Sequence, residues 1–414
     1  MTIEIAILNT YAVALAADTA TTIIDRNGTP GMTHIISKLF TLTKHVGIMF
    51  YGLRDFYSIP WEAFIKLYRE DLEERQTLKE YAEGFVAFLE SHLDKFTPES
   101  QSKRFFHSIY TFFADFAKEL VHRVGINKTK DNSAGIETTA NAMIDKLDLA
   151  SNWETNCCST VEMLPELKVF YDAEIEKIID ETFKDVNLTP TTRDLLKEVA
   201  IKDFFASEDS LLCSGIVFAG FGIDDLFPGI CELLIKGVIN DRLVYKIRFE
   251  SKISRHNEAI IRHYGIKEPV LSFLSGVTPG YQDLAVQSLE KFGDFSKALE
   301  NLIQRLKEMP SIENSTASLL QRIAGAYKEL SKWYLLEHDR KRGKEVNYHW
   351  RQILTNTAAL PEQELATFAE TLLNLTFFKA KYSRSPIDVV TITKGDGFEW
   401  VVRRGERHLK NLKE

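Results

Sequence analysis

The chain has 414 residues, of which 44% are hydrophobic and 27% charged, as in ordinary globular proteins. Its formal net charge of -8 disfavours nonspecific binding to nucleic acid. No apolar run reaches the roughly 18 residues that a membrane span needs, and the N-terminus lacks the basic segment of a secretory signal. We therefore expect a cytoplasmic protein with no nucleic-acid or membrane partner, built as one large domain or two to three smaller ones.

The cysteines predict no metal centre. They are Cys157, Cys158, Cys213 and Cys231, and their spacing matches no zinc site. We expect free or buried thiols, and neither a metal nor another cofactor.

The first elements read as strands. Ile3, Ile5 and Ile7 alternate at period two, which predicts a strand over residues 2–8 that pairs with residues 12–18 in a hairpin. Residues 25–31 are rich in turn formers and predict a loop. Residues 37–53 predict two more strands with a turn near residues 43–45.

Two helices are expected next, over residues 54–75 and 77–96. In the first, Trp61, Phe64 and Tyr68 share one face. In the second, Thr77 followed by Glu80 fits a capping box.

The rest of the chain alternates between helical blocks and groups of strands. Helices are expected over residues 97–210, 281–358 (with a break near 310–315) and 361–380, and strands over 211–247 and 386–402. Because strands do not alternate with single helices, we expect antiparallel sheets covered by helices rather than a doubly wound parallel sheet. The aromatic run at residues 105–116 has the spacing of a buried helix face, or of a protein interface.

Several stretches resemble proteasome β-subunits and the related bacterial peptidase HslV. They are MTIEIAI and YAVALAAD at the start, SKLF around Lys38, VGIMFYGL ending near Gly52, GFGIDDLFPGI, and PIDVVTITKGDGFEWV at the end. Thr2 and Asp18 stand at the interval found in that family. The resemblance covers less than half of the chain, and it depends on the order of these pieces.

The resemblance implies an α+β fold, the four-layer αββα sandwich of N-terminal-nucleophile hydrolases, carrying two large helical insertions. The implied core consists of residues 1–96, 211–282 and 359–414. The implied insertions are residues 97–210 and 283–358. It also implies assembly into a homo-oligomer, and it does not identify a partner ATPase.

The resemblance implies catalysis by Thr2, Asp18 and Lys38, after removal of Met1. An N-terminal threonine carries a hydroxyl nucleophile and an α-amine of pKa about 7.7–8 that can take the hydroxyl proton. A lysine held by an aspartate would favour the neutral amine and the ionised hydroxyl. The implied reaction is hydrolysis of a peptide or amide bond.

The substrate-binding residues implied by the resemblance are Thr22, Phe50 and Gly52. The backbone of Thr22 would pair with the substrate strand, and Phe50 would make the first substrate pocket narrow. The N–H of Gly52 would bind the oxyanion, where a side chain would obstruct close approach.

The sequence departs from the family where supporting residues are expected. Ser275 or Thr278 could replace a serine that follows the central strands, and Ser383 and Ser385 have no aspartate ahead of them. Two alternatives therefore stay open. One is a catalytically inactive proteasome-like scaffold or interaction protein, and the other is an amidase acting on a small molecule.

Other polar residues have simpler interpretations. His256 and His263 are seven residues apart, two turns of a helix, and are expected at the surface rather than on a metal. Asp224 and Asp225 could hold a cation, although a polar turn is the simpler interpretation.

Overall fold

The computed structural model describes residues 3–24, 30–124, 133–150, 160–184, 186, 188–206, 213–266, 268–278, 280–281, 284, 301–302, 304–305, 314–379 and 385–403. For residues 20–24 and 30–35 it describes the backbone only. The described chain is a mixed α+β structure with antiparallel sheets. It contains no helix with the length and apolar character that a membrane span requires.

Ten strands form two five-stranded sheets, and every neighbouring pair is antiparallel. The first sheet has the order β12-β1-β2-β13-β14, and the second has the order β11-β10-β9-β6-β5. The first consists of β12 (Ala259–Gly265), β1 (Ile3–Asn9), β2 (Ala12–Asp18), β13 (Ile387–Thr393) and β14 (Gly397–Arg403). The second consists of β11 (Arg242–Lys252), β10 (Gly229–Ile239), β9 (Ser214–Gly220), β6 (Val46–Gly52) and β5 (Leu39–Thr43).

Two small hairpins extend these sheets. One is β3 (Ala20–Ile24) with β4 (Pro30–Ile35), and the other is β7 (Asp55–Phe56) with β8 (Ile59–Pro60). The helices are α1 (Trp61–Glu70), α2 (Leu78–Glu90), α3 (Pro98–Val124), α4 (Ser133–Ala150), α5 (Thr160–Phe170), α6 (Asp172–Thr182), α7 (Pro190–Ala206), α8 (Glu268–Ser275), α10 (Asn314–Ala358) and α11 (Glu362–Lys379). A 3-10 turn, Leu93–Lys95, follows α2.

Three clusters of buried side chains join the sheets and helices. One contains Leu15 and Ala17 of the first sheet together with Met49 and Val217 of the second, so the two sheets face each other. The opposite face of the first sheet packs against α8 and α11. The opposite face of the second sheet packs against α1 and α2. Because β1, β2 and β9 are covered on both faces, every residue of these three strands is buried.

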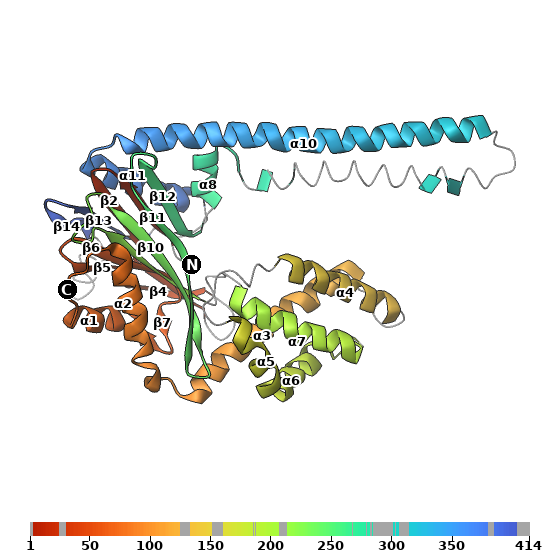
Figure 1. The fold of residues 1–414 in the computed structure, drawn as a ribbon, viewed down its shortest axis with the longest axis horizontal. Coiled ribbons are helices and arrows are strands. Elements are labelled where there is room, and N and C mark those ends of the chain that lie inside the picture. The colour runs from red at the N-terminus through yellow and green to blue at the C-terminus, as the bar shows by residue number, and fades with distance from the viewer. Residues whose placement is uncertain are drawn as a thin grey trace.

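The helices α3–α7 form a bundle with its own core, joined to the sheet at Ile239 and Val244. Phe105, Phe113 and Phe116 of the aromatic run lie in that core, so the core interpretation is confirmed for them. In Figure 1 the bundle and the long helix α10 both project from the same side of the sheets.

Most of the expected strands and helices are confirmed, and two expected helix boundaries are wrong. The helix expected from residue 54 begins at Trp61, because Tyr57 and Ser58 adopt positive φ angles of 52° and 67° and form the turn of the β7–β8 hairpin. The helix expected to reach residue 96 ends at Glu90. Strand β12 was not expected from the sequence. His263 lies on it and is half-buried, whereas His256, in the turn before it, is exposed as expected.

Two predictions, the capping box at Thr77 and the polar turn at Asp225, meet at the start of α2, where the N–H of Leu78 donates to Asp225 at 3.4 Å. Glu80 accepts hydrogen bonds from the Thr77 hydroxyl (3.0 Å) and the Gln76 N–H (3.2 Å), whereas the Thr77 side chain makes no bond to the helix backbone. The capping box is therefore only partly formed. Asp225 accepts the N–H of Gly222 at 2.9 Å and pairs with Lys252 at 2.5 Å, which makes it the centre of a polar turn.

The end of β9 needs a glycine. Gly220 has φ +140°, and a Cβ there would stand 2.1 Å from the carbonyl oxygen of His45. We expect Gly220→Ala to lower the free energy of unfolding by about 2–4 kcal/mol, through backbone strain and overpacking. Gly395→Ala is the matched control, since a Cβ at Gly395 would meet no atom within 4 Å. Urea unfolding of both variants measures the difference, and equal midpoints would contradict this account.

Candidate functional site

Lys38 is the centre of a buried cluster of charged side chains. It directly precedes β5, and its carbonyl oxygen accepts the N–H of Phe50 at 3.1 Å, so its backbone is fixed to β6. Its side chain is only 1% exposed. The Lys38 ammonium donates to Glu4 at 2.9 Å and to Asp18, and both carboxylates are also buried. A lysine of the second sheet is thus bound by carboxylates from two strands of the first.

Asp18 links this lysine to the beginning of the chain. It is the last residue of β2, and its Oδ1 accepts the N–H of Ile3 at 3.1 Å as well as a proton of Lys38. Ile3 is the neighbour of position 2. The next residue, Thr19, donates its N–H to Pro386 at 3.0 Å and accepts the N–H of Ile36 at 2.8 Å. These bonds hold Asp18 at a fixed place beside the start of β1.

The two carboxylates keep the Lys38 ammonium charged. Burial by itself lowers the pKa of Lys38, because it removes water from the cation. The attraction of Asp18 and Glu4 and their hydrogen bonds outweigh burial, so the pKa of Lys38 lies above its ordinary value. In this site Lys38 is a fixed positive charge.

Gly52 is the last residue of β6 and lies at the open end of the β5–β6 hairpin, as Lys38 does. It pairs with Ser214 of β9 and has φ +82°, in the region that favours glycine. The next residue, Leu53, is fixed to β9 from both sides. Its N–H donates to Cys213 at 3.2 Å, and its carbonyl oxygen accepts the Ser214 hydroxyl at 3.2 Å.

Phe50 lies on the helix-facing side of β6. Its side chain is 3% exposed, stacks on Phe40 with ring centroids 6.2 Å apart, and belongs to the cluster beneath α1 and α2. The space next to it is therefore filled by core side chains.

The other residues expected at the site are placed only in part. Thr2 and Ser383 lie outside the described residues, and so does the side chain of Thr22, whose backbone pairs with Thr33 in the β3–β4 hairpin. Ser275 ends α8, where its hydroxyl bonds to the carbonyl oxygens of Leu271 and Val277. The buried hydroxyl of Ser385 lies just before β13, next to Pro386, which binds Thr19.

A second buried polar network lies beside the first, between the sheets. Glu232 of β10 is fully buried and accepts hydrogen bonds from Tyr51 at 2.5 Å and from Arg248 and Arg262 at 2.9 Å each. Tyr51 stacks on Tyr264 with ring centroids 4.8 Å apart. Burial and then the nearby Glu232 carboxylate raise the pKa values of both tyrosines.

The two networks lie on neighbouring strands. Tyr264 stands opposite Glu4 in the β1–β12 ladder, and Tyr51 immediately precedes Gly52. Glu4 and Glu232 were not among the residues expected from sequence. The sequence shows each of them only as a charged residue inside an otherwise apolar strand. The alternating pattern of a strand predicts that such a residue faces solvent.

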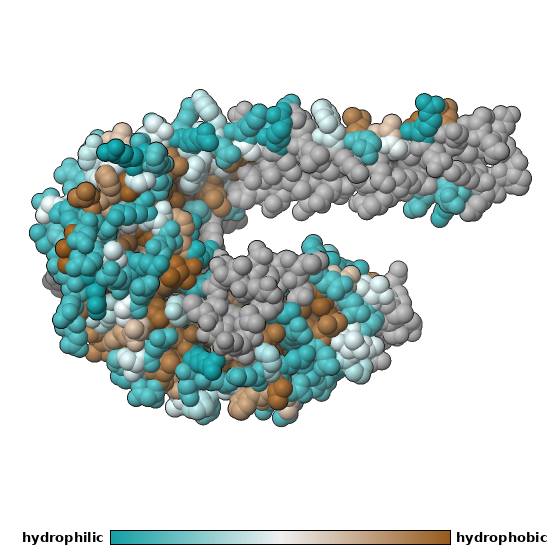
Figure 2. Space-filling view, viewed as in Figure 1, coloured by the Kyte–Doolittle hydropathy of each residue, from teal (hydrophilic) through white to brown (hydrophobic). Residues whose placement is uncertain are grey.

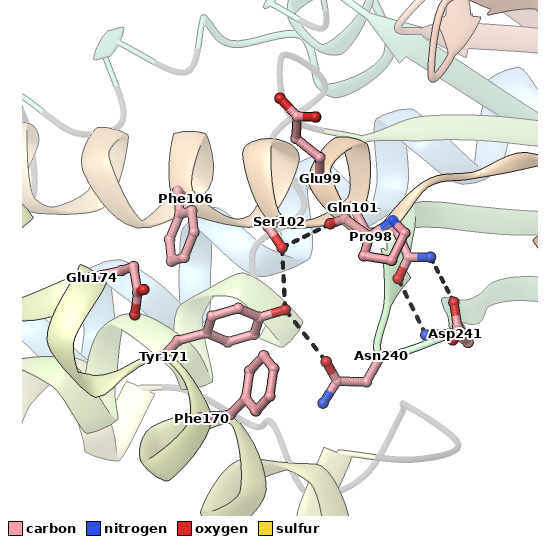
Figure 3. Close-up of a pocket in the computed structure, with 10 residues that line it drawn as sticks. All are labelled: Pro98, Glu99, Gln101, Ser102, Phe106, Phe170, Tyr171, Glu174, Asn240 and Asp241. Atoms are coloured by element: carbon pink, nitrogen blue, oxygen red, sulfur yellow. Dashed lines mark hydrogen bonds between the residues drawn. The ribbon is translucent and has the colours of Figure 1, made fainter.

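The described residues also contain a cavity elsewhere in the fold. It has a volume of about 640 Å³ and lies where α3, the α5–α6 junction and the β10–β11 turn meet (Figure 3). Gln101 and Asp241 exchange two hydrogen bonds there, of 2.8 and 3.2 Å. Tyr171 bonds to Asn240 at 3.3 Å. These contacts fasten the bundle to the sheet, and no member of the Lys38 cluster lines the cavity.

Among the described residues, no group of three or more His, Cys, Asp or Glu side chains could hold a metal ion. Cys213 and Cys231 are buried thiols, and burial raises the pKa of Cys231 to about 12.

Comparisons with known proteins leave the family open. No protein-family model matches the chain, and no curated protein matches it. Among solved structures the chain is similar to a mutant of Anbu from Hyphomicrobium sp. strain MC1. That alignment has a TM-score of 0.26 and 9% sequence identity, and covers 100% of this chain and 93% of the other. A TM-score this low carries no argument about fold or function.

The first expectation from this geometry concerns charge compensation. Lys38→Met would leave two buried carboxylates without their cation, so we expect a loss of about 3–5 kcal/mol in the free energy of unfolding. Lys66→Met is the matched control, because its partner Glu62 is exposed and the pair contributes at most about 1 kcal/mol. Urea unfolding compares the two variants. Equal losses would show that the Lys38 ion pairs contribute no more than a surface pair.

The second expectation from this geometry concerns the stability of the protein at alkaline pH. The pKa values of Lys38, Tyr51 and Tyr264 are all raised by folding. Below about pH 10 these groups are protonated in both states, and above it the unfolded chain loses protons that the folded chain keeps. We therefore expect a free energy of unfolding that falls as the pH rises above about 10. Tyr51→Phe should reduce that slope, and Tyr11→Phe, at an exposed position, should not. Equal slopes in both variants would contradict this.

Proposed function

We propose that this chain is a proteasome-like N-terminal-nucleophile hydrolase that cleaves peptide or amide bonds with Thr2, after removal of Met1. The observation that carries the proposal is the position of the Lys38–Asp18 ion pair. Asp18 binds both the Lys38 ammonium and the N–H of Ile3, the residue next to position 2. A buried cation is thereby held beside the beginning of β1, where the nucleophile would stand.

The proposed mechanism uses two groups of the same residue, the α-amine and the side-chain hydroxyl of Thr2. The neutral α-amine of Thr2 takes the proton of its own hydroxyl, directly or through water, as the oxygen attacks the carbonyl carbon. Lys38 stabilises the developing negative charge on the hydroxyl oxygen, and the N–H of Gly52 donates to the oxyanion. The amine proton passes to the leaving amine, which gives an acyl-enzyme. Water then cleaves that ester and restores the free hydroxyl.

The packing supports the proposed fold. Two facing sheets, with α8 and α11 against one outer face and α1 and α2 against the other, are the arrangement expected of a four-layer αββα sandwich. In this proposal the bundle α3–α7 and the helix α10 belong to insertions at 97–210 and 283–358, and the core consists of 1–96, 211–282 and 359–414. Assembly into a homo-oligomer and the pairing of the Thr22 backbone with the substrate strand are part of the same proposal, whereas Phe50, which is buried beneath α1 and α2, is not placed to line a substrate pocket.

One observation favours the alternative, an inactive scaffold or interaction protein. Leu319, Ile323, Leu330 and Trp333 of α10 are 50–59% exposed, and Figure 2 shows apolar side chains at the surface of this projecting helix. Exposed apolar side chains on one element are typical of protein interaction surfaces.

The test is covalent labelling of the nucleophile. We expect protein made in a bacterial cytosol to lack Met1, and to gain the full mass of one β-lactone molecule when that ring is opened by the Thr2 hydroxyl. Thr2→Ala should abolish the adduct, and Thr2→Ser should retain it because a hydroxyl remains. Intact mass spectrometry measures both. Thr10→Ala, in the turn at the other end of β1, is the matched control and should label as the unmodified sequence does.

A retained Met1 with no adduct would refute the hydrolase proposal and favour the scaffold. An adduct that persists in Thr2→Ala would place the nucleophile elsewhere.

A further inference from the structure

Glu4 is the member of the Lys38 cluster whose presence the proposed mechanism does not explain. Its carboxylate is fully buried and accepts a Lys38 proton at 2.9 Å. A buried carboxylate is costly unless it is paired. Asp18 alone would already compensate the charge of Lys38. With both acids ionised, the three side chains carry a net charge of −1.

The directions of the three N–H groups of the Lys38 ammonium suggest what Glu4 does. An ammonium has three N–H donors arranged tetrahedrally. Asp18 and Glu4 accept two of them, from the ends of β2 and β1. Two fixed partners determine the direction of the third N–H, whereas a single partner would let the ammonium rotate about one bond.

The strand pattern indicates where that third donor is needed. Side chains two residues apart share one face of a strand. A strand continued by one residue before Ile3 would therefore carry the side chain of position 2 on the face of Glu4. On this face the neighbouring strand β12 contributes Tyr264 opposite Glu4, and in the same sheet Asp388 of β13 stands opposite Ala17. Among the described residues, Asp18 and Glu4 are in direct contact with Lys38.

We propose that Glu4 is a positioning residue: together with Asp18 it fixes the Lys38 ammonium by two of its three N–H groups, so that the third is directed at the nucleophile and Lys38 serves as a permanent cation, never as the base. This inference rests on the proposed function. It assigns the proton transfer to the α-amine alone. It also means that a net negative cluster lies next to that amine and favours its protonated form.

Two substitutions separate the charge of Glu4 from its reach. Glu4→Gln removes the charge and keeps the length, so the pH midpoint of the β-lactone acylation rate should fall by about 1 unit. Glu4→Asp keeps the charge and shortens the side chain, so the midpoint should stay while the plateau rate falls about 10- to 100-fold. Glu90→Gln, at the exposed end of α2, is the matched control. A merely structural Glu4 would lower the melting temperature in both variants and leave both midpoints unchanged, which would overturn the inference.

A second measurement is independent of the nucleophile. The 13C resonance of the Lys38 ε-carbon, identified by its absence in Lys38→Arg, reports the protonation of Lys38. We expect it to show no titration below about pH 10 in the unmodified protein, and to titrate at lower pH in Glu4→Gln. Loss of the Lys38 proton below about pH 9 would overturn the inference. If no acylation occurs at all, the proposed function fails, and this titration alone decides whether Glu4 helps to hold Lys38 as a cation.

Discussion

The buried ammonium of Lys38 is the constraint on which this end of the two sheets depends. It belongs to the second sheet, whereas its partners Glu4 and Asp18 belong to the first. Burial of the carboxylates would be costly without the cation, and burial of the cation would be costly without a carboxylate. The ion pairs therefore fix the position of one sheet relative to the other where β1 begins. Apolar packing alone, which tolerates changes of shape, would fix that position less strictly.

The Glu232 network extends this constraint along the interface between the sheets. It joins Tyr51 of β6, Arg248 of β11 and Arg262 of β12 to one carboxylate on β10. Strand β6 carries Gly52, and β12 pairs with the strand that carries Glu4. The proposed oxyanion donor thus lies on a strand that this carboxylate joins, and the proposed positioning residue lies on β1, the neighbour of another such strand.

The order of strands and helices was largely predictable because periodicity and turn residues are local signals. The site was predictable only through the resemblance, which placed Lys38 and Asp18. Taken alone, Lys38 before a strand predicts a solvated side chain, and Glu4 between Ile3 and Ile5 predicts the solvent face of a hairpin. Both predictions fail because the second sheet covers that face. The period-two pattern of a strand does not show whether a second sheet will cover its polar face.

The most direct test of the account is an experimental structure of the protein isolated from cells, with its first residues visible. The proposed mechanism requires that Met1 be absent and that the Thr2 hydroxyl oxygen lie within about 2.7–3.2 Å of the Lys38 nitrogen, while Asp18 and Glu4 accept the other two N–H groups. A chain that keeps Met1, or that directs position 2 away from Lys38, would contradict the central claim and leave the buried cluster as a structural joint between the sheets.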